Sequence, residues 1–346
     1  MRKVLVAALL LALSHPALAQ APYRILKTVM VGGDGGFDYI VADSEGRRLY
    51  IARSGKTNAR LLAFDLDSLK QVGELDGISA HGAVVDPANH HGFASSKPLT
   101  MFDSTNTTLL KSIAVDGNPD GLSLDAGAHR VYVLSHSAPN ITAINTADGA
   151  VLGTANLDAA VEETVSDGKG HLYVALEDKD AVGVVDSKSM TVTARYPLAG
   201  QDGVRGGTPA GLALDARNHV LFVACRNPAV LVMMNADSGA ILTSLPIGAQ
   251  NDGVLFNPAT REALAPTGDG HLTVVKEDGP SRFSIAQTLA TLPGARTIAL
   301  DTKTGHIFLM TADYGPVPAD APPAVPGRIA RGPMLADSFK IIEIGR

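Results

Sequence analysis

The feature that most constrains this chain of 346 residues is a repeat of about 43 residues. Seven short apolar runs each end in Asp or Asn: IVAD (Asp43), AVVD (Asp86), LSLD (Asp125), TVSD (Asp167), LALD (Asp215), VLFN (Asn257) and IALD (Asp301). We call these seven residues the anchors. Successive anchors are 43, 39, 42, 48, 42 and 44 positions apart. A period of this size is typical of repeat architectures, in which each unit buries its apolar face against the next.

Each repeat has the pattern of four short β-strands. A polar turn follows the anchor, and then come alternating runs rich in β-branched and aromatic residues, such as RLYIA, RVYVLS and VLFVAC. Two further runs follow, separated by turns about every 8–12 residues, which indicates antiparallel β-structure. Four strands per unit, repeated seven times, predict an all-β fold, a seven-bladed β-propeller of four-stranded blades.

The two ends of the chain predict how the propeller closes. The last repeat contains only three strand-like runs, TIALD, HIFLMT and SFKIIEI. The run RILKTVMVGG near the N-terminus resembles the fourth-strand segments LLKSIAVDG and LKQVGELDG. We therefore expect the N-terminal strand to complete blade seven, which removes an exposed sheet edge. Residues 20–346 are then a single propeller domain.

Residues 1–19, MRKVLVAALLLALSHPALA, have the pattern of a secretory signal peptide. Arg2 and Lys3 precede an apolar run over residues 4–13, and Ala17 and Ala19 provide the small residues of a cleavage site. The apolar run is too short to span a bilayer stably. We expect a periplasmic or secreted protein with no membrane span after removal of the signal.

Composition excludes several function classes. The net charge is −6 and the pI is about 5.9, so no nucleic acid is expected as a partner. A single Cys rules out an intrachain disulfide framework, a thiolate zinc cluster and a CxxCH haem attachment. We expect a monomer whose partner is a small-molecule ligand or another periplasmic protein.

The repeats resemble a known family. The segments GGFDYIVADSEGRRLYIA, GKGHLYVALEDKDAVGVVDSKSM and GARTIALDTKTGHIFL are similar to the YVTN repeats of YncE-like secreted seven-bladed β-propellers. The resemblance covers nearly all of the chain after residue 19. It implies the fold but no reaction, because members of the family generally lack an assigned one, so function has to be argued from the site.

A candidate site comes from the residues five positions before each anchor. These residues start the innermost strands and therefore surround one mouth of the central channel. The seven residues are Asp38, His81, Asp120, Glu162, Ala210, Asp252 and Arg296, and all of them except Ala210 are ionisable. Carboxylates converging on a channel favour a divalent cation or a polar ligand, although Asp residues also stabilise turns. We take Asp38, Asp120, Glu162 and Asp252 as candidate ligands of calcium, magnesium or zinc, and His81 and Glu162 as candidate catalytic residues.

The loops after the second strands lie at the same mouth. They add His136, Glu177, Arg226, Asn227 and Asp269. Arg226 could bind an anionic group with both of its terminal nitrogens, or could form a salt bridge. Together with neighbouring Tyr39, the candidate ligand-binding residues are Asp38, Tyr39, His81, Asp120, His136, Arg226 and Arg296.

A long loop in the seventh repeat also lies on this face. Residues 313–334 include six prolines, and the segment is about 22 residues longer than its counterpart in the fifth repeat. Proline-rich segments are extended and stiff. We expect this segment, called the flap, to cover the channel mouth; the alternative is a disordered excursion.

Two functions from different classes fit these residues. The first is a periplasmic propeller that binds a small polar or anionic ligand at the channel mouth, with or without a divalent cation. The second is a metal-dependent hydrolase, similar to lactonases, or a lyase that uses the same site. Whether the protein is an enzyme stays open at this point.

Overall fold

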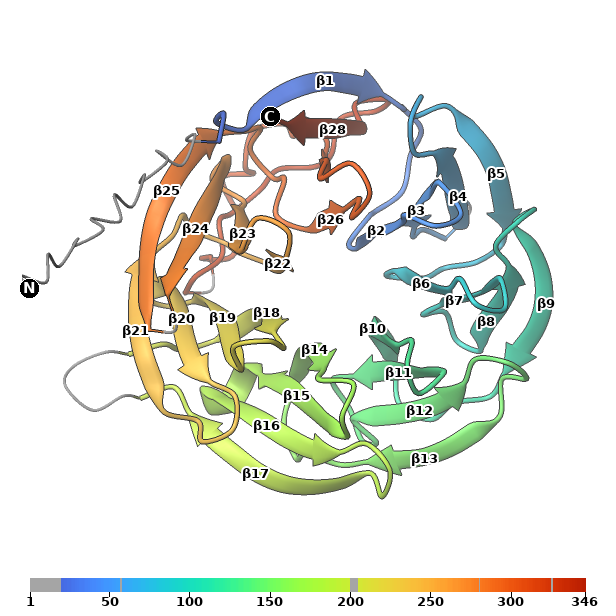
Figure 1. Ribbon diagram of the computed structural model, residues 1–346. Coiled ribbons are helices and arrows are strands. Elements are labelled where there is room, and N and C mark those ends of the chain that lie inside the picture. Colours follow the sequence, from blue (N-terminus) through green and yellow to red (C-terminus); the bar gives the residue numbers. More distant parts are fainter. Residues whose placement is uncertain (1–19, 57, 200–204, 280, 325) are drawn as a thin grey trace, which may run out of the picture.

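The computed structural model describes residues 20–346 except 57, 200–204, 280 and 325. The expected signal peptide lies outside the described residues. The described residues form seven four-stranded antiparallel sheets arranged as blades around a central axis (Figure 1). The predicted seven-bladed β-propeller is therefore confirmed. No helix among the described residues is both long and apolar enough to cross a membrane.

Each of blades 1 to 3 consists of four consecutive strands. Blade 1 contains β2 (Ile40–Asp43), β3 (Arg48–Arg53), β4 (Arg60–Asp65) and β5 (Gln71–Asp76). Blade 2 contains β6 (Ala83–Asp86), β7 (His91–Ala94), β8 (Leu99–Asp103) and β9 (Thr108–Ile113). Blade 3 contains β10 (Pro119–Asp125), β11 (Arg130–Ser135), β12 (Ile141–Asn145) and β13 (Val151–Ala155).

Blades 4 to 6 repeat this order. Blade 4 contains β14 (Val161–Ser166), β15 (His171–Leu176), β16 (Ala181–Asp186) and β17 (Thr191–Pro197), with a 3-10 turn, η1 (Glu177–Lys179), after β15. Blade 5 contains β18 (Pro209–Asp215), β19 (Val220–Arg226), β20 (Ala229–Asn235) and β21 (Ile241–Pro246). Blade 6 contains β22 (Leu255–Asn257), β23 (Glu262–Thr267), β24 (His271–Gly279) and β25 (Arg282–Ala290).

Blade 7 joins the two ends of the chain. Its strands are β26 (Ile298–Leu300), β27 (Ile307–Thr311), β28 (Lys340–Gly345) and, on the outside, β1 (Arg24–Met30). Strand β1 pairs antiparallel with β28, from Arg24 opposite Gly345 to Met30 opposite Lys340. Figure 1 shows β1 along the outer rim beside β28, as the sequence predicted.

The apolar core lies between the blades. Its buried residues fall into seven clusters, each of which combines side chains of two adjacent blades. In β11, Tyr132 belongs to the cluster shared with blade 4, whereas Val131 and Val133 belong to the cluster shared with blade 2. Successive side chains of a strand point to opposite faces, so a strand buried on both faces is apolar at nearly every position.

The anchors are structural residues. In each of the seven, a side-chain oxygen accepts a hydrogen bond from a backbone N–H two or three residues later, as between Asp43 and Gly46 at 2.9 Å. Some anchors also join adjacent blades. The hydroxyl of Thr146 in blade 3, for example, donates a hydrogen bond to Asp86 of blade 2 at 2.6 Å. The repeated Asp therefore stabilises a turn and, in such cases, the contact between blades.

Replacing Asp86 by Ala should lower the free energy of unfolding by about 3 kcal/mol, because a buried acceptor with charge-assisted hydrogen bonds is lost. The Asp86 side chain is fully buried, and the change leaves the Thr146 hydroxyl and the Ala88 N–H without their acceptor. Urea denaturation measures the loss. The control is Asp103→Ala, which removes a similar turn hydrogen bond at a partly exposed position. Equal losses for both variants would contradict the role in blade contact.

Candidate functional site

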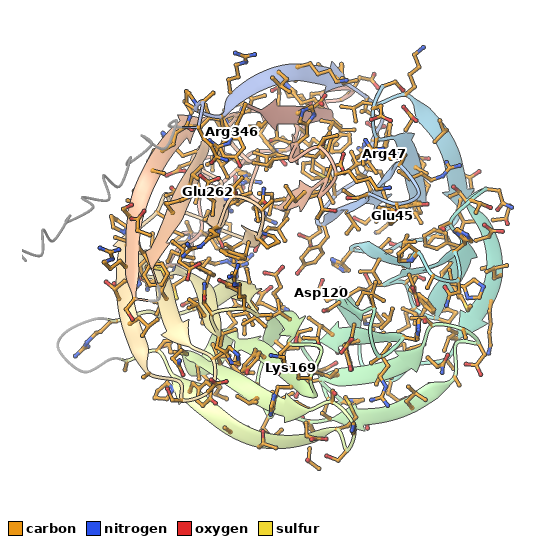
Figure 2. All side chains as sticks on the ribbon, in the orientation of Figure 1. Glu45, Arg47, Asp120, Lys169, Glu262 and Arg346 are labelled. Carbon is orange, nitrogen blue, oxygen red and sulfur yellow. The ribbon has the colours of Figure 1, made fainter. Side chains whose placement is uncertain are left out.

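The starts of the innermost strands bring the predicted residues together around the axis. Asp38, His81, Asp252 and Arg296 lie in the loops just before their strands, whereas Asp120 and Glu162 lie in the first residues of β10 and β14. In Figure 2 the Asp120 side chain points toward the axis. The remaining position, Ala210 of β18, is buried.

Carboxylates and imidazoles alternate across blades 1 to 4. His81 Nδ1 lies 3.0 Å from Asp38 Oδ2 and 3.2 Å from Asp120 Oδ1. His136, which directly follows β11, places Nε2 3.1 Å from Asp120 Oδ2 and 4.0 Å from Glu162 Oε2. Asp120 is therefore shared, with one oxygen toward each imidazole.

Carboxylates and guanidinium groups alternate across the remaining blades. Arg226 Nη1 lies 3.1 Å from Glu162 Oε1, and Nη2 contacts Asp252. Arg296 Nε lies 2.7 Å from Asp252 Oδ2, and its Nη2 lies 3.7 Å from Asp38 Oδ1. The series of contacts that began at Asp38 thus ends at Asp38 and forms a closed circle. We call the closed set the axial ring: Asp38, His81, Asp120, His136, Glu162, Arg226, Asp252 and Arg296.

The environment of the ring shifts several pKa values. The hydrogen bond with Asp38 raises the pKa of His81, and the one with Asp120 raises the pKa of His136, in each case against the effect of burial. Burial raises the pKa of the Glu162 carboxyl to about 7, although Arg226 opposes this. Both imidazoles therefore favour the positive form, which compensates the neighbouring carboxylates.

Two neighbours support the ring from within the propeller. The Tyr39 hydroxyl faces the Glu162 carbonyl oxygen at 3.5 Å, and burial raises the pKa of Tyr39. The Glu163 side chain accepts a hydrogen bond from the Leu212 N–H at 2.6 Å, and burial raises the pKa of Glu163 to about 8. Glu163 therefore favours the neutral carboxylic acid at pH 7.

Two groups in the ring have the composition of a cation site. Asp38, His81 and Asp120 form the first, and Asp120, His136 and Glu162 form the second; in each group the ligand atoms lie within 4.8 Å of one another. Asp252, another predicted cation ligand, belongs to neither group. Its charge is compensated by Arg226 and Arg296, whereas the imidazoles of His81 and His136 complete the two groups.

The loops after the second strands contribute unequally. His136, Glu177 and Arg226 reach the ring, and Glu177 Oε1 lies 2.5 Å from Arg226 Nη1. Sequence reasoning noted Glu177 without assigning it a role. Its position just after β15, matching that of His136 after β11, is the signal that identifies it. Asp269 instead accepts hydrogen bonds from Thr267 and the Ala249 N–H.

Neither Arg226 nor the single cysteine is freely available to a ligand. The Arg226 side chain is buried and contacts three carboxylates of the protein. Of the two roles considered from the sequence, anion binding and salt-bridge formation, its contacts are those of a salt bridge. The Cys225 side chain is also buried, which raises the pKa of its thiol to about 12. A thiolate nucleophile at this position is therefore disfavoured.

The flap lies against the ring. Its base is a hairpin, in which Gly315 N–H donates to Pro333 O at 2.8 Å. Further along, Arg328 Nη2 lies 3.5 Å from Glu177 Oε1, and Arg331 Nη2 lies 3.1 Å from Gln250 Oε1. These partners belong to blade 4 and to the loop before blade 6. The flap therefore extends from blade 7 across the face that carries the ring.

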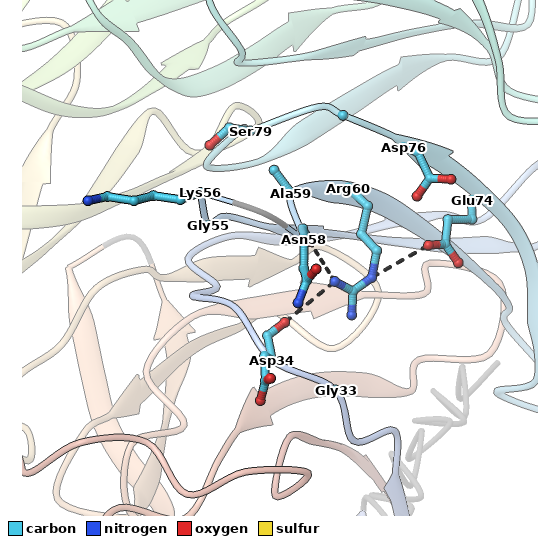
Figure 3. Close-up of a pocket in the computed structure, with 11 residues that line it drawn as sticks. Gly33, Asp34, Gly55, Lys56, Asn58, Ala59, Arg60, Glu74, Asp76 and Ser79 are labelled. Carbon is cyan, nitrogen blue, oxygen red and sulfur yellow. Dashed lines mark hydrogen bonds and ion pairs between the residues drawn. The ribbon is translucent and has the colours of Figure 1, made fainter.

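Two cavities open near this face. The larger, about 710 Å³, lies at blade 1, where Arg60 contacts Glu74 and the backbone oxygens of Asp34 and Asn58 (Figure 3). Arg60 therefore already has an ion-pair partner and hydrogen-bond acceptors within the protein. The smaller, about 200 Å³, includes Asp38 and Arg296 of the ring together with Tyr314 and Arg331 of the flap. Sequence reasoning did not assign Tyr314 or Arg331 to the site.

Comparisons with known proteins agree with the fold. The chain is 23% identical over 195 residues to "Uncharacterized protein YncE" of Salmonella typhi and of Salmonella typhimurium, which covers 54% of this chain. The match spans 53%, about half, of the length of these curated relatives. No family model matches the chain.

Solved structures show the same architecture. One chain of "Crystal Structure of Mitotic Checkpoint Complex" matches with a TM-score of 0.69 at 13% identity, covering 89% of this chain and 96% of its own. "Crystal structure of RRP9 WD40 repeats" matches with a TM-score of 0.70 at 11% identity, covering 93% and 97%. These likenesses concern the fold alone. The weak similarity to YncE and the seven-bladed fold together support a YncE-like β-propeller.

Proposed function

We propose that this protein is a periplasmic YncE-like binding propeller that holds a small polar or anionic ligand at the axial ring through a divalent cation. The observation that carries the proposal is the pair of histidine–carboxylate groups that share Asp120. The periplasmic location in this proposal is inferred from the signal-peptide pattern of residues 1–19.

The donor set favours zinc among the three candidate cations. Calcium and magnesium prefer ligands that are all oxygen, whereas zinc binds imidazole nitrogen together with carboxylate oxygen. A three-ligand zinc site leaves a coordination position for a ligand atom. Arg296, which contacts Asp38 at the edge of the first group, would then face the negative part of a bound molecule.

Zinc titration of the chain from residue 20 onward, after treatment with EDTA, tests the proposal. We expect calorimetry to show that zinc binds at least tenfold more weakly to a group whose histidine is removed, by His81→Ala in the first group and by His136→Ala in the second, because each variant removes that group's nitrogen ligand. Affinity should also fall as the pH is lowered, since both histidines have raised pKa values and zinc must displace their protons.

The matched control is His171→Ala. His171 is an exposed histidine whose Nδ1 lies 2.7 Å from Asp167, so it also belongs to a histidine–aspartate pair. This pair lies at the turn between β14 and β15, at the end of β14 opposite to Glu162. Zinc binding should be unchanged in this variant. Absence of zinc binding, or an equal loss in all three variants, would refute a cation site in the ring.

A metal-dependent hydrolase is the second candidate, and the raised pKa of Glu162 favours it. A carboxylate whose pKa lies near the working pH can exchange protons with a substrate. Zinc-loaded protein assayed with lactones and simple esters separates the two functions. Turnover that requires zinc and is lost in Glu162→Gln supports the hydrolase, whereas zinc binding without turnover supports the binding propeller.

A further inference from the structure

The smaller cavity beside the axial ring has features that the cation groups do not explain. It lies where blade 7 meets blade 1, and the flap contributes Tyr314, Arg331 and Met334 to its walls. Its volume of about 200 Å³ is below the roughly 300–1,000 Å³ of pockets for drug-sized ligands. The cavity therefore suits a molecule smaller than a typical drug-sized ligand.

Two guanidinium groups face this cavity. Arg296 is paired with Asp252, but Arg331 forms no ion pair with any carboxylate in the described part of the chain. Arg331 instead contacts the Gln250 side-chain oxygen and stacks over the Tyr314 ring at 5.2 Å from its centroid. Burial and the nearby charge of Arg296 lower the pKa of Arg331. An anion between the two arginines would remove this repulsion.

The balance of charges on the cavity wall limits the charge of that anion. Asp38 directs Oδ2 to His81 and Oδ1 to Arg296, so its charge is compensated within the ring. The guanidinium of Arg331 is then the uncompensated charge of the cavity. A single negative charge balances it, whereas the second charge of a dianion would find no uncompensated cation among the lining residues.

Two glycines lie beside the Arg331 guanidinium, and Gly268 leaves room for it. A Cβ on Gly268 would lie 3.0 Å from Arg331 Nη2. A Cβ on Gly294 would lie 3.6 Å from Arg331 Cζ and 2.6 Å from Thr311 Oγ1, and Gly294 has a φ of +88°, a conformation that favours glycine. The backbone around the cavity therefore accommodates the buried part of this side chain.

We propose that the cavity binds a small monocarboxylate, with its carboxylate between Arg296 and Arg331. Its apolar part would lie against Met334 and against Phe37, which also lines the cavity. A guanidinium group matches the planar geometry of a carboxylate with two parallel hydrogen bonds. This inference rests on the proposed binding function and names the chemical class of the ligand, and the two guanidinium contacts that it uses do not require a bound cation.

Calorimetric titration of the EDTA-treated chain from residue 20 onward with isobutyrate and benzoate tests the proposal. We expect saturable one-to-one binding that is stronger than the binding of sulfate or phosphate. Arg331→Gln should weaken it about 10- to 100-fold, the usual effect of removing charge-assisted hydrogen bonds. Arg331→Lys keeps the charge but lacks the planar guanidinium, so its carboxylate affinity should lie between those of the parent protein and Arg331→Gln. Thermal melts check that both variants are folded.

The matched control is Arg60→Gln, which removes the same charge from the larger cavity of blade 1 (Figure 3). Carboxylate affinity should be unchanged in this variant. Absence of carboxylate binding, preference for sulfate or phosphate, or equal affinity in folded Arg331→Gln would overturn the proposal. Zinc titration of the same samples keeps the two proposals apart, because Arg331 belongs to neither cation group.

Discussion

A chain that begins at Gly33 should unfold at a much lower temperature than one that begins at Gln20. The deletion removes β1, whose residues pair with β28 over the full length of that strand. At about 1 kcal/mol per net hydrogen bond, the lost pairing amounts to about 5 kcal/mol. This is a large part of the roughly 5–15 kcal/mol that stabilises a typical domain. The uncovered edge of β28 should also promote association between molecules.

Thermal denaturation and size-exclusion chromatography measure these two effects. The matched control begins at Tyr23, which keeps β1 and the buried Tyr23 side chain but removes three residues, among them the exposed Gln20 and Ala21. Its midpoint should remain close to that of the longer chain. If the chain that begins at Gly33 keeps the same midpoint, β1 does not hold the propeller closed.

Replacing Arg226 by Ala should lower the free energy of unfolding by about 3–5 kcal/mol, the range found when one partner of a buried ion pair is removed. Arg226 contacts Glu162, Glu177 and Asp252, and its Nε donates to the Asn251 carbonyl oxygen at 3.0 Å. The variant leaves three carboxylates around an unfilled space. The free energy of unfolding of Arg226→Lys should lie between those of the parent protein and Arg226→Ala, because one ammonium group cannot reach all of these partners.

The sign of the pH dependence gives a sharper test. Without Arg226, the three carboxylates should have raised pKa values in the folded state, so the variant binds more protons when folded than when unfolded. Its deficit relative to the parent protein should therefore shrink as the pH is lowered from about 8 to about 5. Urea denaturation at both pH values measures this change.

Arg328→Ala is the matched control for Arg226. Arg328 lies 3.5 Å from Glu177 and 3.9 Å from Glu162 but is substantially exposed. Its removal should cost about 1 kcal/mol or less, as for other exposed ion pairs. A similar loss for both arginines, or a deficit for Arg226→Ala that does not change with pH, would contradict the role of Arg226 as the buried counter-charge.

The strand pattern of this fold was predictable because it depends on neighbouring residues. The side chain of an anchor such as Asp43 or Asp86 bonds a backbone N–H two or three positions later, so each repeat carries its own turn signal. The apolar runs that follow reflect burial on both faces of a strand. The missing fourth strand of the last repeat likewise indicated that β1 completes blade 7 and closes the propeller.

The axial ring was predictable only in part. Counting five positions back from each anchor correctly placed Asp38, His81 and Asp120 around the axis, where His81 contacts both carboxylates. The same count could not show that His136 lies between Asp120 and Glu162, or that Arg226 compensates Asp252. Those contacts join residues of adjacent blades, and their geometry depends on how the blades pack.

The sequence by itself determined the period, the strand order, the closure and the chemical types gathered at the channel mouth. The tertiary structure alone decided which charges compensate one another and which residues the flap contacts. Arg331 shows the difference, because its partner Gln250 is 81 positions away in the chain. The physical reason is that a repeat is recorded in local spacing, whereas a side chain's charge partner depends on distances in space between segments far apart in the chain.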